Sequence, residues 1–191
     1  MATAQTKLLS ADEFYEWGNH ADNEDGLYEL DEGKIVELSL PGEVHGVICS
    51  LISYLLGNYI FQRGKGYGCS NHTGLVLKRK PGTVLGPDFM LFDEKRTLKM
   101  LTWKFAEDAP KLVVEVLSPS DRPSRINRRV GQYLKRRIPL VWLVDPEERK
   151  VTVYRPGKDL YVLEETEELT GADVLPGLRL QVADLFALPG Q

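Results

Sequence analysis

The sequence predicts an α/β fold in which a mixed β-sheet is flanked by helices. The main observation is a strand–helix–strand succession: residues 111–118 and 140–146 are largely apolar, and residues 124–137 carry apolar side chains at helical spacing. Two strands joined through a helix run parallel, with a right-handed crossover. Alternating segments with glycine turns elsewhere predict antiparallel hairpins, so the sheet should be mixed. Because the chain has no repeats and no linker-like stretch, a single domain over residues 1–191 is expected.

The first elements expected along the chain are a short helix and a hairpin. Ser10 and Glu13 have the spacing of a capping box, which predicts a helix that starts after Ser10. Residues 27–40 alternate around a turn at residues 31–33 that ends in glycine. This pattern is typical of a β-hairpin.

A long helix and two strands are expected next. From Val44 to about Gly64, apolar residues recur at helical spacing. Residues 72–82 and 83–93 are expected to form two strands joined by a Pro-Gly turn.

The second half of the chain completes the α/β pattern. Pro139 ends the helix expected over residues 124–137. The segment 140–146 is nearly all apolar, which predicts a strand buried on both faces. Residues 150–165 are expected to form a closing hairpin, and residues 175–186 a C-terminal extension.

The composition is ordinary for a soluble globular protein, with 42% apolar and 27% charged residues. We expect no apolar run to reach the roughly 20 residues that a membrane-spanning helix needs, and the first residues do not resemble a secretory signal. The two cysteines, Cys49 and Cys69, match no zinc-binding pattern and fit a reducing compartment. We therefore expect a cytoplasmic protein without a membrane partner.

Positive charge is concentrated in one segment of an acidic chain. The net charge is −4, which disfavours a general nucleic-acid binder. Between residues 122 and 138, however, there are seven cations and no acid: Arg122, Arg125, Arg128, Arg129, Lys135, Arg136 and Arg137. The segment could be the solvated face of an amphipathic helix. The missing acidic partners at helical spacing favour a face that binds anions.

Glu115 stands in the middle of an otherwise apolar strand. A buried, unpaired carboxylate costs several kcal/mol, so Glu115 needs a proton, a cation or a metal ion. Asp88 follows Pro87, which marks a strand start or an edge. Two such acids on adjacent strands suit Mg²⁺ or Mn²⁺. The alternatives are an ion pair between Glu115 and an arginine of the following helix, and a turn role for Asp88.

Six segments resemble, in order, the Uma-type (Uma-two) restriction-endonuclease-like family of the PD-(D/E)XK nuclease superfamily. They are "LYELDEGKIVEL", "PGEVHGVI", "GPDFMLF", "PKLVVEVLSPSDR", "YLKRRIPLVWLVDPEERKVTVYRPG" and "VLPGLRL". The resemblance covers nearly the whole chain. It implies a restriction-endonuclease-like core with Asp88 and Glu115 as metal ligands, and supporting roles for Glu29 and His45.

The chain departs from the superfamily pattern at one position. The lysine expected two residues after the acid is Leu117 here. Uma-type proteins commonly place a lysine four residues before the helix tyrosine, and counting back from Tyr133 gives Arg129. Arginine can stabilise developing phosphate charge, but it cannot act as a base. We expect Arg129 to turn toward Glu115.

Structural explanations remain open for several of these residues. Glu29 and Glu37 could lie on the solvated face of the hairpin, and His45 could be an ordinary structural histidine. Asp145 is expected to cap a turn at a strand end rather than to bind metal.

The function that these observations favour is a Mg²⁺- or Mn²⁺-dependent endonuclease that hydrolyses DNA phosphodiester bonds. Duplex cleavage needs two active sites, so a homodimer is expected. Four arginines are expected to contact backbone phosphates: Arg122, Arg125, Arg128 and Arg136. One alternative is a catalytically inactive nuclease-fold protein that binds nucleic acid or protein. A small-molecule hydrolase on the same scaffold is also open, because a fold does not determine function.

Overall fold

The computed structural model describes residues 7–23, 26–188 and 190. They form a mixed α/β structure, as predicted, with the chain divided into two compact units. The first unit comprises the described residues within Met1–Leu40, Thr73–Gly86 and Thr102–Asp108. The second comprises those within Pro41–His72, Pro87–Leu101 and Ala109–Gln191. The single domain expected over residues 1–191 stays a prediction, and each unit is described by itself.

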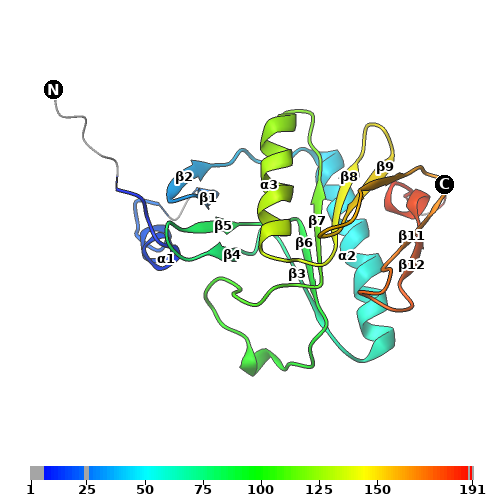
Figure 1. The fold of residues 1–191 in the computed structure, drawn as a ribbon, viewed down its shortest axis with the longest axis horizontal. Helices are drawn as coiled ribbons and strands as arrows, with labels where there is room; N and C mark the ends of the chain where they lie inside the picture. Colours follow the sequence, from blue (N-terminus) through cyan, green and yellow to red (C-terminus); the bar gives the residue numbers. More distant parts are fainter. Residues whose placement is uncertain (1–6, 24–25, 189, 191) are drawn as a thin grey trace. The chain divides into compact units, whose positions relative to one another are not determined.

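The first unit contains one helix and a four-stranded antiparallel sheet with the order β2-β1-β5-β4 (Figure 1). Its elements are α1 (Ala11–Gly18), β1 (Tyr28–Asp31), β2 (Lys34–Glu37), β4 (Leu75–Lys78) and β5 (Thr83–Leu85). The expected capping box of α1 is present, because Ser10 and Glu13 exchange both of its hydrogen bonds. The β1–β2 turn places Glu32 and Gly33 at positive φ, as a tight hairpin turn requires.

The second unit is built on a six-stranded sheet with the order β10-β9-β8-β7-β6-β3. The strands are β3 (Tyr67–Ser70), β6 (Phe89–Phe92), β7 (Leu112–Val116), β8 (Val141–Asp145), β9 (Lys150–Tyr154) and β10 (Tyr161–Leu163). Strands β7 and β8 are parallel, as predicted, and the other pairs are antiparallel. A short hairpin of β11 (Glu168–Thr170) and β12 (Arg179–Gln181) follows, and two single-turn 3-10 helices span Leu98–Met100 and Val182–Leu185.

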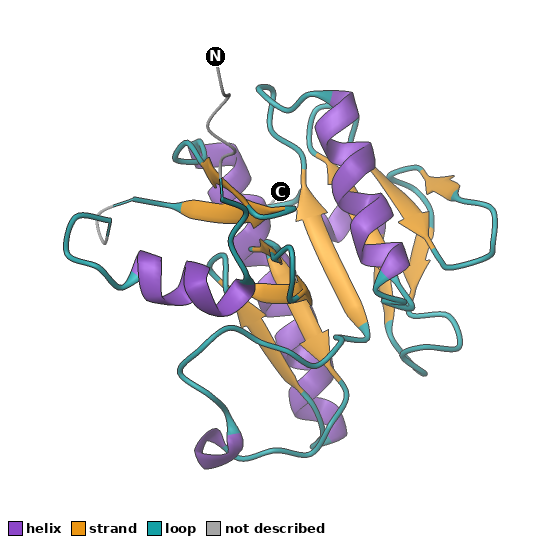
Figure 2. Ribbon diagram, turned by 60° about the vertical axis from the view of Figure 1, so that its left-hand side comes forward, coloured by secondary structure: helices purple, strands orange, loops and turns teal. Residues whose placement is uncertain are grey.

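Helices α2 (Glu43–Arg63) and α3 (Pro123–Lys135) cover opposite faces of this sheet (Figures 1 and 2). Residues of α2 share one core with the side chains of Leu112, Val114 and Val116. The alternate residues of β7, Val113 and Glu115, therefore point to the face that α3 covers. The carboxylate of Glu115 thus comes to lie beneath the basic helix rather than in the core under α2.

The segment 83–93 does not form the single strand that its sequence suggests. Residues Thr83–Leu85 are β5 in the four-stranded sheet, whereas Phe89–Phe92 are β6 in the six-stranded sheet. Pro87 lies between them and has no N–H to donate to a ladder, so pairing must stop there. Asp88 consequently stands at the first position before β6, where the chain enters a new sheet.

Helix α2 is apolar around most of its circumference. No Asp, Glu, Lys or Arg lies between Glu43 and Arg63, and an 18-residue stretch has a mean hydropathy of 1.5. By length and composition α2 could therefore span a membrane, and the expectation that no apolar run is long enough is wrong for this helix. Helices in the core of water-soluble proteins can have the same length and composition. The buried side of α2 packs in the core of the second unit through Ile48, Ile52, Leu56 and Tyr59.

Candidate functional site

Asp88 is held at the point where β6 and β7 stop pairing. The ladder between these strands ends with the pair Phe89 and Val114. One residue further, the side chain of Asp88 instead of a backbone carbonyl accepts a hydrogen bond from β7. Its Oδ2 accepts the backbone N–H of Val116 at 2.7 Å, and its Oδ1 lies 3.4 Å from Nε2 of His45. Asp88 is 7% exposed, so both oxygens are fixed in a largely dry environment.

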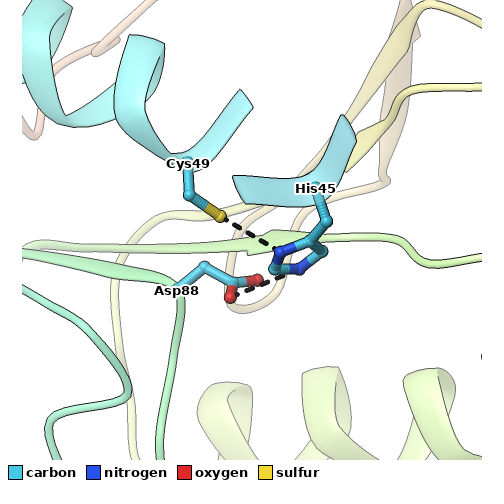
Figure 3. A group of neighbouring side chains, drawn as sticks. All are labelled: His45, Cys49 and Asp88. Atoms are coloured by element: carbon cyan, nitrogen blue, oxygen red, sulfur yellow. Dashed lines mark hydrogen bonds and ion pairs between the residues drawn. The ribbon is translucent and has the colours of Figure 1, made fainter. Parts of the chain in front are cut away.

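His45 approaches Asp88 from the first turn of α2, with Cys49 one turn further along (Figure 3). Nδ1 of His45 lies 3.5 Å from the Cys49 sulfur. The hydrogen bond with Asp88 raises the pKa of His45 from 6.5 to about 10, with a smaller contribution from Cys49, while burial opposes both. Burial raises the pKa of the Cys49 thiol, with the His45 contact opposing it. At neutral pH, therefore, a charged imidazolium faces the Asp88 carboxylate and a protonated thiol.

Glu115 is held by two side chains of α3. Nη2 of Arg129 donates to Glu115 Oε1 at 2.7 Å, and Nε of Arg129 lies 3.3 Å from the same oxygen. The hydroxyl of Tyr133 also donates to Glu115 Oε1, and Nη2 of Arg129 lies 3.4 Å from that hydroxyl. Arg129 and Glu115 side chains are only 11% and 9% exposed. The result is a buried ion pair with a phenol hydrogen bond, which meets the requirement that a buried charge be paired.

The expected contact between Arg129 and Glu115 is confirmed by these hydrogen bonds. The same contact also fits the alternative explanation, in which Glu115 forms a purely structural ion pair with an arginine of the following helix. The helical spacing of the apolar residues places Arg129 at the edge of the buried stripe of α3, within reach of the strand.

Two residues of the site were missed by sequence analysis. Tyr133 served in the sequence analysis only as the residue from which Arg129 was counted, although a buried tyrosine hydroxyl needs a partner and position 133 is one turn after Arg129. Cys49 was set aside because the cysteine spacing matches no zinc pattern. Its position four residues after His45 on one helix is the signal that could have identified it.

Glu29 belongs to the first unit and has a local partner there. It is buried on β1, and its Oε1 accepts the N–H of Gly86 at 2.7 Å. The solvated position that was an alternative for Glu29 is therefore wrong, whereas Glu37 is exposed. The catalytic role of Glu29 implied by the family resemblance stays a prediction.

A pocket of about 570 Å³ opens beside His45 in the second unit. Its wall includes Leu117, at the position where the superfamily pattern has lysine, and Asp145 at the end of β8. Oδ1 of Asp145 accepts the N–H groups of Glu147 and Glu148, both at 3.0 Å. Asp145 therefore caps a turn, as expected.

The basic residues expected to meet phosphate lie on or beside α3. The four that were assigned to nucleic-acid contact are exposed: Arg122, Arg125, Arg128 and Arg136. Arg122 is the N-cap residue and Arg136 the C-cap residue, so the group extends over the whole length of the helix. Arg129 differs from them because its guanidinium is buried against Glu115.

The donor atoms of the site fit two kinds of cation. Among the described residues the buried carboxylates are Glu29, Asp88 and Glu115. The last two come from adjacent strands and offer the oxygen ligands that Mg²⁺ and Mn²⁺ prefer. In the same described part of the chain, His45, Cys49 and Asp88 form a second arrangement, with one donor atom from each within 4.8 Å of the others.

Comparison with known proteins agrees with this fold. A crystal structure described as "a putative nuclease belonging to DUF820 from Anabaena variabilis ATCC 29413" matches with a TM-score of 0.78 and 22% sequence identity. The match covers 93% of this chain and 97% of that chain. No curated protein matches the chain. The sequence model of the Uma2 family, described as "Putative restriction endonuclease", matches residues 11–183. Because this match covers most of the chain, the protein belongs to the Uma2 family.

Proposed function

We propose that the protein is a metal-dependent endonuclease that hydrolyses phosphodiester bonds of DNA. One observation carries the proposal: two buried acids, Asp88 and Glu115, come from neighbouring strands, and Asp88 binds the N–H of the residue that follows Glu115. Burying acids is costly, and a cation shared by the two carboxylates would offset that cost. Membership of the Uma2 family supports the same assignment.

In this proposal Asp88 and Glu115 hold Mg²⁺ or Mn²⁺ through carboxylate oxygens. When bound, the ion activates water and neutralises charge on the phosphate. Arg129 lies against Glu115 and supplies a permanent positive charge for the phosphate oxygens. His45 orients Asp88 through the contact of Nε2 with Oδ1. Glu29 keeps the supporting role that the family resemblance implies.

The exposed arginines of α3 are proposed to bind the DNA backbone. Such contacts are independent of sequence and weaken as salt concentration rises. The predicted partners Arg122, Arg125, Arg128 and Arg136 would each neutralise one phosphate. Their charge stands out because the remainder of the chain is acidic.

The test is cleavage of plasmid and single-stranded DNA with Mg²⁺ or Mn²⁺, compared with EDTA. We expect metal-dependent cleavage that is lost in Asp88→Asn and in Glu115→Gln. Asp145→Asn is the matched control, because Asp145 lines the neighbouring pocket and only caps a turn that asparagine can also cap. Cleavage by wild type and by both acid variants at equal rates would refute the assignment of the acids.

A catalytically inactive binding protein is the second candidate. Two observations favour it: Glu115 is already paired with the charge of Arg129 and accepts a hydrogen bond from Tyr133, and position 117 is leucine. This candidate predicts binding of labelled DNA by fluorescence anisotropy without cleavage under any metal. It also predicts that Arg125→Ala and Arg128→Ala weaken binding and reduce its salt dependence.

We also propose that the protein is a homodimer, because cleavage of both strands of a duplex would need two active sites. Light scattering at micromolar protein concentration tests this directly. A monomer at that concentration would restrict the proposed activity to nicking or to single strands.

A further inference from the structure

His45, Cys49 and Asp88 bring three different kinds of metal-binding atom to one place (Figure 3). His45 and Cys49 are four residues apart in α2, so their side chains leave the same side of the helix. Asp88 reaches this place from the residue before β6. A ring nitrogen, the sulfur and a carboxylate oxygen lie within 4.8 Å of one another.

The donor types indicate which ion would bind there. Thiolate and imidazole suit Zn²⁺, whereas Mg²⁺ strongly prefers oxygen ligands. With metal–ligand bonds of about 2.0–2.3 Å, the donor atoms around a tetrahedral zinc ion lie roughly 3.3–3.6 Å apart. The His45 Nε2–Asp88 Oδ1 distance of 3.4 Å and the Cys49 Sγ–His45 Nδ1 distance of 3.5 Å have this size.

A small rearrangement would complete the ligand set. An imidazole binds a metal through one nitrogen, while His45 now meets Cys49 and Asp88 through different nitrogens. Because the three donor atoms already lie within 4.8 Å of one another, reaching the spacing around a tetrahedral ion requires shifts on the order of 1 Å. His45 also lines the pocket of about 570 Å³, so an ion and a water ligand can reach the imidazole from that side.

We propose that His45, Cys49 and Asp88 form a Zn²⁺ site, with water as the fourth ligand. The thiol of Cys49 loses its proton to solvent when the ion binds. Because Asp88 is also one of the two acids assigned to Mg²⁺, Zn²⁺ at this site inhibits DNA cleavage by occupying Asp88. The inhibition rests on the proposed function, whereas Zn²⁺ binding does not.

The first test uses Co²⁺ as a spectroscopic substitute for Zn²⁺ on the full chain, freed of metal with EDTA and then desalted. We expect a thiolate-to-Co²⁺ charge-transfer band in the near ultraviolet that disappears when Zn²⁺ is added. Cys49→Ser should abolish the band and weaken Zn²⁺ binding by more than about tenfold, since even outer ligand partners contribute that much.

Cys69→Ser is the matched control for this test. Cys69 is the other thiol of the sequence, is also half-buried, and lies in β3 outside the group of three donors. Its variant should keep the band. A wild-type protein without the band, or a Cys49→Ser variant with an undiminished band, would overturn the proposal.

A second measurement needs no variant. Iodoacetamide modification of Cys49, followed by peptide mass spectrometry, should be slowed by Zn²⁺ and unaffected by Mg²⁺. Modification of Cys69 should be the same with and without Zn²⁺. Equal protection of both thiols, or of neither, would refute a site that includes Cys49.

Cleavage assays separate the two proposals. A thiolate–Co²⁺ band in a protein that never cuts DNA would end the endonuclease proposal and leave the zinc site standing. Cleavage that Zn²⁺ inhibits in wild type and Cys69→Ser, but at least about tenfold less effectively in Cys49→Ser, is the expected result. Equal inhibition of all three proteins would overturn the inhibitory role.

Discussion

The two buried acids of the second unit have partners of different chemistry. Asp88 faces His45, whose charge can be lost, and accepts one backbone N–H. Glu115 faces Arg129, which is always charged, and accepts a bond from Tyr133. One acid thus has a partner that can itself become a metal ligand, and the other has a partner that never can.

Because of this difference, the side chains around the two acids suit different cations. An imidazole and a thiol lie beside Asp88, whereas the guanidinium of Arg129 and the phenol of Tyr133 lie beside Glu115. In the two proposed sites, Asp88 is a ligand of both ions, whereas Glu115 is a ligand of Mg²⁺ or Mn²⁺ alone. Substitutions of the residues that contact Asp88 and Glu115 test this difference.

Removing the guanidinium should destabilise the fold most. Arg129→Met leaves Glu115 buried without its charge partner, and we expect the free energy of unfolding to fall by about 3–5 kcal/mol. Urea denaturation measures this change in the free energy of unfolding. Arg128→Met, on the exposed side of the same helix, should change stability by no more than about 0.5 kcal/mol. Adding Glu115→Gln to Arg129→Met should restore part of the lost stability. If the stability changes of the two single variants simply add up in the double variant, the two side chains are not coupled.

Substitutions at Arg129 should also separate charge from geometry in catalysis. Arg129→Ala should lower the rate of metal-dependent DNA cleavage by about 100-fold, as loss of one charge-stabilising group does. Arg129→Lys should retain or raise the rate, since lysine is the residue of the family pattern. Because these variants differ in stability, rates are compared below the unfolding temperature of each. A Lys variant as slow as the Ala variant would refute the role of charge at position 129.

The Tyr133 hydroxyl should contribute less than the arginine. Tyr133→Phe removes a hydrogen bond to a carboxylate, and we expect a loss of about 1.5–3 kcal/mol in urea unfolding. Tyr59→Phe is the comparison, because the Tyr59 hydroxyl donates to the neutral carbonyl of Pro176 at 3.1 Å. That variant should lose only about 0.5–1.5 kcal/mol. A larger loss of stability in Tyr59→Phe than in Tyr133→Phe would contradict a charged Glu115 as the acceptor of the Tyr133 hydroxyl.

The contribution of the His45–Asp88 ion pair to stability should depend on pH near neutrality, unlike that of the Arg129–Glu115 ion pair. Asp88 and Cys49 raise the pKa of His45 from 6.5 to about 10. The protonated His45 therefore stabilises the folded state, and this contribution is complete below pH 6.5. It declines between pH 6.5 and about 10, because over this range only the folded state holds the proton, and it is lost above that range. In EDTA, unfolding free energies between pH 6 and 10 should therefore fall more steeply in wild type than in His45→Asn. Parallel curves would refute the His45–Asp88 ion pair.

Much of the fold follows from local patterns that act over a few residues. The capping box at Ser10, the glycine turn at residues 31–33 and the apolar strand at 140–146 each have a local physical cause, and each is present. The assignment of residues 83–93 to one strand was wrong, because local pattern does not say which sheet a strand will join. Pro87 marks the break, but only the pairing of β6 with β7 shows where the chain goes.

For the site, the amino-acid sequence alone requires that Glu115 have a partner, since an acid inside an apolar strand is otherwise too costly. It also indicates Arg129, through helical spacing from the buried stripe of α3. That Tyr133 also binds Glu115, and that His45 and Cys49 lie beside Asp88, follows from the three-dimensional packing alone. These contacts join residues from 18 to 43 positions apart, and the packing of α2 and α3 on opposite faces of one sheet, rather than any local periodicity, brings them together.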